Sequence, residues 1–375
     1  MPKIRKVKPI NKEALNSLGY GWHTDEDGEY FAFDELVEVS SLEAQAYYKA
    51  AKDVYEMYEK AAEYVVENSL FEDLDIEKNM VDYIKYSWKS ERHLHLYGRF
   101  DFSGGIDAKD IKLIEFNSDT PTLLFETAIA QFMMLKDDEQ QFNSVYEKIS
   151  QKIKRIIKQD ENLVPKFLFS CVKDISEEEL TTKFLQKIAV DAGAVANFEF
   201  MEDLLFNEDI IDKNKNSYDI WFKLFPWEEL SLEHDEILAV LSSSKSFKTI
   251  NPAYTLLYQS KGMLKVLYDL FPDSPYLLKS SFTALEEKYV KKPCFGREGA
   301  NIEIVDADKK VLLSTDGIYD NFKVVYQEYV DFVRDEKGRY YQAGVFFSDE
   351  PCGLSFRRGE EILDDMSEFI GHIVI

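Results

Sequence analysis

Cysteine is scarce in this chain of 375 residues, and that scarcity excludes two classes of protein. The three cysteines are Cys171, Cys294 and Cys352. Such an odd, widely spaced set does not build a disulfide framework and lacks the close pairs of a zinc site. No histidine or asparagine partner can be read near any of them, so we interpret each as a buried thiol rather than a nucleophile.

Positive charge is also in short supply. The chain has 45 lysines and arginines against 70 aspartates and glutamates, which gives a net charge of −25. A surface of this sign does not attract the phosphates of nucleic acids or anionic membranes. The acidic residues are spread along the chain rather than gathered in a tail, so we interpret most of them as solvated surface. We therefore expect no nucleic-acid partner.

Long apolar runs are missing as well. No run approaches the roughly 20 residues that a membrane-spanning helix needs. The first residues, MPKIRKVKPINKEAL, are basic but include no apolar segment of the kind a secretory signal carries. Aromatic residues are abundant, with 27 Phe and 22 Tyr, and no repeat occurs. These features predict a globular, cytoplasmic protein with no membrane partner.

The most informative pattern that is present runs from residue 99 to 122. Two alternating runs, LYGRFDF and KLIEFN, flank the glycine-containing SGGIDAKD, which predicts a two-stranded hairpin. Residues two apart on a strand point to the same face, so Arg99 and Asp101 can converge, as can Glu115 and Asn117.

These four side chains suit a metal and phosphate. Two carboxylates and an amide oxygen are hard ligands that Mg²⁺ prefers when substrate phosphates complete its shell. Arg99 beside them would neutralise phosphate charge. The alternative is that the acids simply face water, as they often do in acidic hairpins.

The remaining pattern divides the chain by texture. Helical periodicity covers 41–68, with a serine at its start, and 126–159, in one or two helices. A βαβ-like region then predicts a small parallel sheet. From about 251, a helix that ends at Pro272 is followed by strands with tight turns, which indicates an antiparallel α+β segment. The βαβ-like runs are strands at 166–172, 196–201 and 218–225, a helix at 176–193 and a short helical piece at 228–242.

A second candidate site lies in the last region. Lys292 precedes the segment CFGREGAN, in which Gly296 and Gly299 are three apart. A lysine at a strand end before a glycine-bearing loop allows backbone N–H groups and an ammonium group to approach phosphates. It is not a P-loop, and most such loops are ordinary turns. By themselves, Lys261 and Arg357 are typical of exposed or structural residues.

Taken together, these motifs resemble the ATP-dependent ligase part of the glutathionylspermidine synthase family, which has an ATP-grasp fold. They follow the expected order along nearly the whole chain, and GYGWHTDEDGEYFAFD (19–34) and the terminal HIVI also fit. The carrying motifs are RFDF (99–102), EFNSDTPTLLFETA (115–128), NPAY…YQSKGMLKVLYDLFP (251–272), KKPCFGREGANI (291–302) and GLSFRRG (353–359).

The resemblance implies an α+β and α/β protein with a glutathione-synthetase-like ATP-grasp fold of permuted order. It includes a small parallel β/α subdomain and an antiparallel lid. We expect three domains. Residues 1–160 would form an N-terminal helical and hairpin part with the metal ligands, 161–250 a pre-ATP-grasp-like subdomain, and 251–375 the nucleotide-binding part with the glycine-loop lid.

The resemblance also implies a role for each candidate residue. The Mg²⁺ ligands would be Asp101, Glu115 and Asn117. Other residues would contact the phosphates of ATP or its adenine. These are Arg99 on the transferred phosphate, Lys261 and Lys292 on the nucleotide phosphates, Gly296 and Gly299 in a loop that closes over the triphosphate, Arg357 on the phosphates during transfer, and Gln327 to Val330, with Tyr329, along the adenine.

The implied activity is ATP- and Mg²⁺-dependent ligation of a small-molecule or peptide carboxylate to an amine, polyamines included. Bifunctional relatives add an N-terminal amidase domain with a catalytic cysteine, for which we expect no counterpart here. The alternatives are a nucleotide-binding protein with a regulatory or scaffolding role, and ligation to another nucleophile. A glycosidase-like pair of Asp101 and Glu115 would leave Asn117 and the basic residues unexplained.

Overall fold

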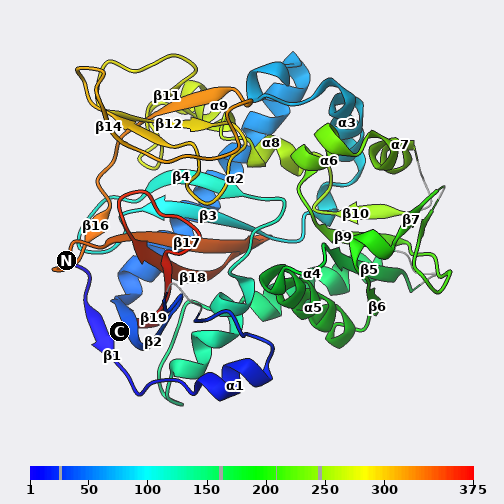
Figure 1. The fold of residues 1–375 in the computed structure, drawn as a ribbon, viewed down its shortest axis with the longest axis horizontal. Coiled ribbons are helices and arrows are strands. Elements are labelled where there is room, and N and C mark those ends of the chain that lie inside the picture. Colours follow the sequence, from blue (N-terminus) through cyan, green and yellow to red (C-terminus); the bar gives the residue numbers. More distant parts are fainter. Residues whose placement is uncertain (25–27, 160–163, 208, 244–246) are drawn as a thin grey trace.

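A computed structural model of the chain describes residues 1–24, 28–159, 164–207, 209–243 and 247–375. Residues 25–27 of the aromatic motif at 19–34 lie outside the described residues. Three main sheets organise the molecule, and Figure 1 shows the five-stranded sheet above the eight-stranded sheet, with the parallel sheet to one side. The mixed α and β composition agrees with the expected class.

The largest sheet combines strands from both ends of the sequence, in the order β1-β2-β19-β18-β17-β3-β4, and β16 pairs with β17. The predicted hairpin is confirmed, with Arg99 opposite Asn117 and Asp101 opposite Glu115. The strands are β1 (Ile4–Lys6), β2 (Phe31–Val39), β3 (Gly98–Ser103), β4 (Lys112–Asn117), β16 (Val333–Arg334), β17 (Tyr340–Ser348), β18 (Glu350–Gly359) and β19 (Glu368–Val374).

The two faces of this sheet have different characters because side chains alternate along each strand. Phe100, Phe102 and Phe116 lie in the core with α2 (Ser41–Asn68), the helix predicted for 41–68. Ser40 and Glu43 form a reciprocal capping box at its start. The opposite face of β3 and β4 carries the four polar residues of the hairpin.

The second sheet is parallel, as predicted, with the order β10-β9-β5-β6. Its strands are β5 (Lys166–Cys171), β6 (Val195–Phe198), β9 (Ile220–Leu224) and β10 (Lys248–Ile250), and its main helix is α5 (Ser176–Asp191). The helical piece predicted at 228–242 forms two helices, α6 (Trp227–Glu233) and α7 (Asp235–Ser243), which are separated at His234.

The helix predicted over 126–159 is only partly present. Residues 145–158 form α4 (Val145–Lys158), but the start is a π-helical turn, η4 (Glu126–Ala130), and a 3-10 turn, η5 (Phe132–Met134). Between them and α4, the backbone of Gln140 and Phe142 accepts hydrogen bonds from the N–H groups of Val374 and Leu354. Pairing with β18 and β19 therefore replaces helix in this stretch.

The third sheet is antiparallel, with the order β11-β15-β12-β13-β14. Its strands are β11 (Ser280–Ser281), β12 (Tyr289–Pro293), β13 (Glu303–Val305), β14 (Val311–Ser314) and β15 (Val324–Glu328). The helix predicted to end at Pro272 is broken into α8 (Thr255–Gln259) and α9 (Met263–Leu270). Lys261 lies in the break.

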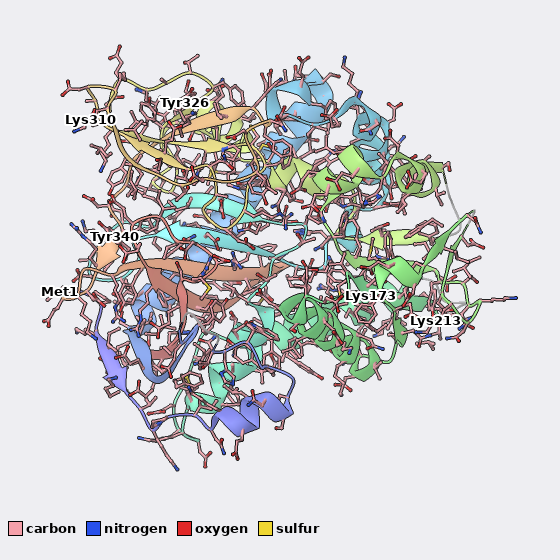
Figure 2. All side chains as sticks on the ribbon, in the orientation of Figure 1. Met1, Lys173, Lys213, Lys310, Tyr326 and Tyr340 are labelled. Carbon is pink, nitrogen blue, oxygen red and sulfur yellow. The ribbon has the colours of Figure 1, made fainter. Side chains whose placement is uncertain are left out.

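Shorter elements complete the fold. In Figure 2, Lys310 and Tyr326 mark the five-stranded sheet, while Lys173 and Lys213 lie at the opposite end of the molecule, near the parallel sheet.

No helix within the described ranges has the length and apolar character to cross a membrane. The shorter elements are α1 (Lys12–Ser17), α3 (Val81–Ser90), β7 (Leu205–Phe206), β8 (Ile210–Ile211), and 3-10 turns η1 (Glu72–Leu74), η2 (Lys78–Met80), η3 (Arg92–Leu94) and η6 (Met201–Asp203).

The expected division into domains at residues 160 and 250 stays a prediction. In terms of sheets, β17 to β19 from the last predicted domain share one sheet with β2 to β4 from the first.

Candidate active site

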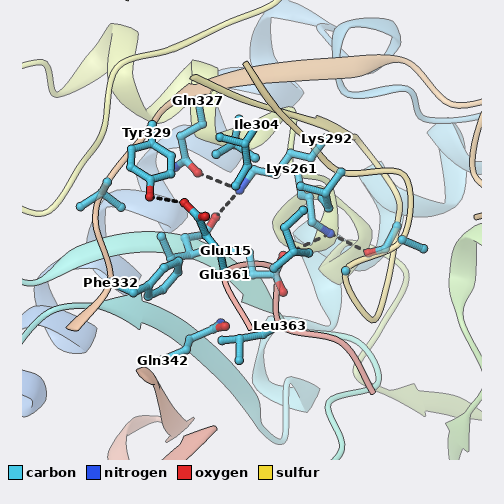
Figure 3. Close-up of a pocket in the computed structure, with 18 of the residues that line it drawn as sticks. Glu115, Lys261, Lys292, Ile304, Gln327, Tyr329, Phe332, Gln342, Glu361 and Leu363 are labelled. Atoms are coloured by element: carbon cyan, nitrogen blue, oxygen red, sulfur yellow. Dashed lines mark hydrogen bonds and ion pairs between the residues drawn. The ribbon is translucent and has the colours of Figure 1, made fainter. Parts of the chain in front are cut away.

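A pocket lies where β4 of the eight-stranded sheet meets the five-stranded sheet (Figure 3). Most of the predicted nucleotide-binding residues line it, although they come from separate parts of the chain. The predicted residues in the lining are Glu115, Lys261, Lys292, Gly296, Gly299, Gln327 and Tyr329.

Lys292 joins the two sheets at this pocket. Its ammonium group donates to the carbonyl of Ile114 at 2.9 Å and to Oε1 of Gln327 at 2.7 Å. The side chain is only 3% exposed, and burial lowers the pKa of Lys292 to about 7. An anionic ligand beside this ammonium group would offset the cost of burying it.

Lys261 reaches the same pocket from the break between α8 and α9. Its backbone N–H donates to the carbonyl of Cys294 at 2.8 Å, which ties the break to the end of β12. The hydroxyl of Ser260 donates to the carbonyl of Leu74 at 2.7 Å. The ammonium group of Lys261 then donates to the carbonyl of Gly296 at 2.7 Å and lies 3.3 Å from Glu115 Oε2.

The carboxylate of Glu115 is stabilised by the positive charges of both Lys261 and Lys292. Burial raises the pKa of its carboxyl group, but Lys261 and Lys292 outweigh burial and hold the pKa at about 2. Glu115 is therefore an anion at neutral pH, placed between cations.

The other hairpin residues lie beside the pocket lining. Arg99 donates twice to Asp101, at 2.7 and 3.0 Å, and once to the carbonyl of Thr122 at 2.9 Å. Burial raises the pKa of the Asp101 carboxyl group despite Arg99. Gly344 lies opposite Asp101 on β17, and a Cβ there would come within 3.2 Å of Arg99 Cδ, so the glycine leaves room for the guanidinium.

The carboxylates of Asp101 and Glu115 share one hydrogen-bond donor. The amide nitrogen of Asn117 donates to Asp101 at 3.1 Å and to Glu115 at 3.3 Å. A half-turn of this amide would present its oxygen to the same point, because the two amide ends are similar in shape.

The three side chains therefore fit the hard ligand set that Mg²⁺ takes together with phosphate oxygens. No group of three or more His, Cys, Asp and Glu side chains gathers as a metal site in the part of the chain that the structure describes, and the hairpin supplies two carboxylates and one amide.

Arg357 lies on β18 opposite Gln342, which lines the pocket. One end of its guanidinium donates to the carbonyl of Asp364, and its Nε has no hydrogen-bond partner among the described residues. Its charge lowers the pKa of Asp101, which places it near the carboxylates. This position is compatible with contact to a transferred phosphate.

The other half of the pocket is apolar, and Figure 3 shows Ile304, Phe332 and Leu363 facing it. Gln327 does not project a free amide into this half, since it accepts from Lys292 and donates to Leu113 O at 3.1 Å. The Tyr329 hydroxyl donates to Glu361. An apolar half beside a charged half matches the two ends of a nucleotide.

The glycine-bearing loop requires one of its glycines. Gly299 has φ +69°, and a Cβ there would lie 2.5 Å from the carbonyl oxygen of Leu363. Arg297 fastens the loop by donating to Thr120 at 3.0 Å and to Glu228 of α6 at 2.8 Å.

Sequence reasoning missed several residues of the site. For Arg297, its positive charge between the two loop glycines, Gly296 and Gly299, could have indicated a place in the site. Gln342 and Glu361 gave no such signal, because pairing of distant strands brings them to the pocket.

The three cysteines are free and buried, as predicted. Burial raises the pKa of Cys171 and of Cys294 to about 12. It also raises the pKa of Cys352. None of them is a thiolate at neutral pH, so nucleophilic roles are disfavoured.

Known proteins resemble this chain along its length. The family described as glutathionylspermidine synthase preATP-grasp matches residues 3–375. A Haemophilus influenzae protein, named as a candidate acid–amine ligase, is 27% identical over 393 residues and is covered to 98%, as is this chain. The bifunctional glutathionylspermidine synthetase/amidase of Escherichia coli is 25% identical over 344 residues, which are 84% of this chain and 55% of that protein.

A solved structure confirms the fold class. The glutathione synthetase-like effector of Globodera pallida superimposes with a TM-score of 0.57 at 10% identity, and the alignment covers 98% of each chain. At that identity the likeness concerns the fold alone. The glutathione-synthetase-like ATP-grasp fold expected from the sequence is thus confirmed.

Proposed function

The chain belongs to the glutathionylspermidine synthase family, and from that membership we propose that it is an ATP-dependent carboxylate–amine ligase. One observation carries the proposal most directly. Lys261 and Lys292 converge on Glu115 at the charged end of a pocket whose other end is apolar. Such a site suits a nucleotide with its phosphates at the charged end and its base at the apolar end.

The proposed reaction has two steps. A carboxylate oxygen of the acid substrate attacks the γ-phosphorus of ATP, the bond to the ADP oxygen breaks, and an acyl phosphate forms. The nitrogen of the amine then attacks the carbonyl carbon. The C–N bond forms, the C–O bond to phosphate breaks, phosphate leaves, and the nitrogen loses a proton.

The side chains of the chain would act by position and charge. Lys261 and Lys292 would hold the phosphates of the nucleotide, and Arg99 and Arg357 would offset the charge that spreads over the transferred group. Arg99 is already oriented by its double hydrogen bond to Asp101. Mg²⁺, held by Asp101, Glu115 and Asn117, would neutralise phosphate oxygens.

The proposed adenine site is the apolar half of the pocket. Val290 and Ile304 line it from β12 and β13, and the backbone from Gln327 to Val330 runs along it. Tyr329 would border the base, and the loop with Gly296 and Gly299 would cover the triphosphate.

The substrates can be proposed as classes. The name of the E. coli relative refers to a conjugate of glutathione with spermidine, which is a polyamine. We propose a small-molecule or peptide carboxylate and an amine, with polyamines among the candidates. The three unpaired thiols and the need for ATP favour work in the cytoplasm.

Release of ADP from the full chain, measured by a coupled assay with Mg-ATP and pairs of acids and amines, tests this proposal. We expect ADP release that requires both substrates and an amide product visible by mass spectrometry. Glu115→Gln keeps the shape of the side chain and should slow turnover by about 100- to 1000-fold. Nucleotide binding without turnover for any pair would favour a regulatory protein, and wild-type rates in Glu115→Gln would refute the site.

A further inference from the structure

The open edge of the five-stranded sheet is an apolar strand with which no other strand of the described residues pairs. This strand is β14, the last in the order β11-β15-β12-β13-β14. All four of its residues are exposed, among them Val311 at 47%, Leu312 at 49% and Leu313 at 38%. Figure 2 shows Lys310, which directly precedes the strand, at the margin of the molecule. Proteins usually protect such an edge, because exposed apolar edge strands pair with other strands.

The backbone of β14 presents hydrogen-bonding groups to this open edge. The N–H of Thr315 donates inward to the carbonyl of Ile302 at 3.0 Å. Successive residues of an antiparallel strand direct their backbone groups to opposite sides, so Leu313 also faces β13, while Leu312 and Ser314 face the open edge. A partner strand would have to match these two outward-facing residues.

Opposite charges flank the strand. Lys310 lies immediately before β14, and Asp316 lies two residues after its end. Both side chains are exposed, and neither forms an ion pair with another described residue. The neighbouring Lys309 is already occupied, because its ammonium group donates to the carbonyl groups of Leu285 and Glu286.

Two copies of β14 placed antiparallel satisfy both patterns in a single register. With the twofold axis at Leu313, Leu312 of each copy lies opposite Ser314 of the other, so the outward-facing backbone groups pair with each other. The same register places Lys310 of each copy opposite Asp316 of the other. The strand is therefore complementary to itself in backbone direction and in charge.

The neighbouring registers lose this match. A shift of one residue sets outward-facing residues opposite inward-facing ones. A shift of two residues sets Asp308 opposite Asp316 in one direction and Lys310 opposite Ile318 in the other. Two copies that each carry a net charge of −25 repel each other overall, so a register that adds like charges is disfavoured.

We propose that β14 is an interface between two copies of this chain, in which the two strands pair antiparallel about Leu313 and join two five-stranded sheets into one. The proposal does not depend on the ligase function, since no residue of β14 lines the nucleotide pocket. The strand is short, and its pairing with β13 shifts register between Ile304 and Val305. An interface of this size is typical of weak, reversible association, so we expect a dissociation constant in the micromolar range.

Sedimentation velocity of the full chain tests the proposal, over protein concentrations from about 1 to about 300 µM, which bracket micromolar dissociation constants. We expect the mass of one chain at the lowest concentration and of two chains at the highest. Ser314→Pro removes an N–H that faces solvent in the single chain, where an edge strand tolerates proline, but that pairs in the dimer. It should weaken association by about 10-fold or more, since two hydrogen bonds are lost, one from each copy.

Charge reversal tests the register. Lys310→Asp and Asp316→Lys each set like charges opposite one another at both ends of the paired strands. Each single variant should therefore weaken association by about 10-fold. The double variant that carries both substitutions restores opposite charges in the exchanged sense, and it should dimerise as the wild type does.

A matched pair of leucine variants separates the edge strand from other exposed apolar residues. Leu313→Lys places two ammonium groups opposite each other at the twofold axis and should abolish the dimer. Leu205 is 59% exposed on β7, which Figure 1 shows at the other end of the molecule, so Leu205→Lys should leave dimerisation unchanged. Should Ser314→Pro or Leu313→Lys prove unfolded by thermal melting, the charge-reversal variants, which change exposed side chains alone, carry the test.

Each other outcome contradicts the proposal. A single chain at every concentration would overturn it and leave the edge to a strand of another protein. A dimer that persists unchanged in Ser314→Pro and in both single charge variants would place the interface elsewhere. Assemblies larger than two would mean a head-to-tail contact rather than a twofold pairing. Loss of the dimer in both single charge variants without recovery in the double variant would refute the register.

Discussion

Two regions of the molecule, the proposed nucleotide pocket and the buried carboxylates of Glu126 and Glu177, differ in how their buried charges are paired. In the pocket, Lys292 has two acceptors and Glu115 lies beside Lys261 and Asn117. At Glu126, neither carboxylate oxygen has a hydrogen bond of good geometry among the described residues, although the nearby Trp22 indole and the Glu126 backbone lower the pKa of this carboxyl group. The first arrangement pairs its charges within the protein, although burial still lowers the pKa of Lys292, whereas the second leaves buried carboxylate oxygens without a cationic partner at hydrogen-bond distance.

The largest effect is expected where the pocket is most fully connected. Lys292→Ala should weaken ADP binding by about 10- to 100-fold, because a charge-assisted contact to phosphate is lost. It also leaves two buried acceptors, on Ile114 and Gln327, without a donor. Calorimetric titration with ADP measures the effect.

The neighbouring lysine is the control for that experiment. Lys291 pairs with Glu303 at 2.9 Å and does not line the pocket, so Lys291→Ala should leave ADP affinity unchanged. Equal losses in the two variants would mean that general stability, rather than a phosphate contact, accounts for the effect.

The next effect concerns the pH dependence of stability. The Glu126 carboxyl group has a pKa of about 8 in the folded chain and an ordinary value near 4.3 when unfolded. Between these values the folded state keeps a proton that the unfolded state has lost, so the free energy of unfolding falls as pH rises. The side chain of Glu126→Gln does not titrate. The free energy of unfolding of this variant, relative to that of the wild type, should therefore rise by on the order of 2 kcal/mol from pH 5 to pH 8.

Chemical denaturation at pH 5, 6.5 and 8, without amine, measures that difference. A constant gap between the two proteins at the three pH values would show that Glu126 is compensated in the free protein. The contrast between the two regions would then be wrong.

The smallest effect is expected at the loop beside both regions. Gly299→Ala places a side chain where φ is +69° and where the Leu363 carbonyl oxygen would lie 2.5 Å from it. The left-handed strain alone is about 1 kcal/mol, so we expect a KM for ATP raised by about 3- to 10-fold. Gly338→Ala is the control, since it has φ +83°, open space around it and no place in the pocket. Similar changes of the KM for ATP in both variants would mean that the loop at Gly299 has no specific role in nucleotide binding.

The sequence was a good guide wherever local pattern decides structure. Alternation fixed the hairpin, so Asp101 and Glu115 were expected on one face, and they lie opposite each other on paired strands. Helical periodicity located α2, whose start is capped by Ser40. Glycine spacing located the loop at Gly299.

Pattern failed where distant segments compete for the same backbone. Residues 135–144 have helical spacing, but their hydrogen bonds go to β18 and β19. The break at Lys261 depends on contacts with Leu74 and Cys294 that no local signal encodes. The spacing of apolar residues around Glu126 predicts an ordinary helix. It indicates neither the π-helical turn nor the burial of this side chain.

The order of strands in the large sheet has a consequence for how this protein matures. Between β2 and β3 lie β19, β18 and β17, which come from the far end of the sequence. When β2, β3 and β4 have been synthesised, the three strands that separate β2 from β3 in the sheet are therefore still missing. Closing the sheet requires loops of great length, a slow event by the rules of folding kinetics. Arg357 on β18 therefore comes near Asp101 only after most of the chain has been synthesised. Fragments that end before β17 lack Arg357 and the strand that pairs with β3, so they cannot form the complete site.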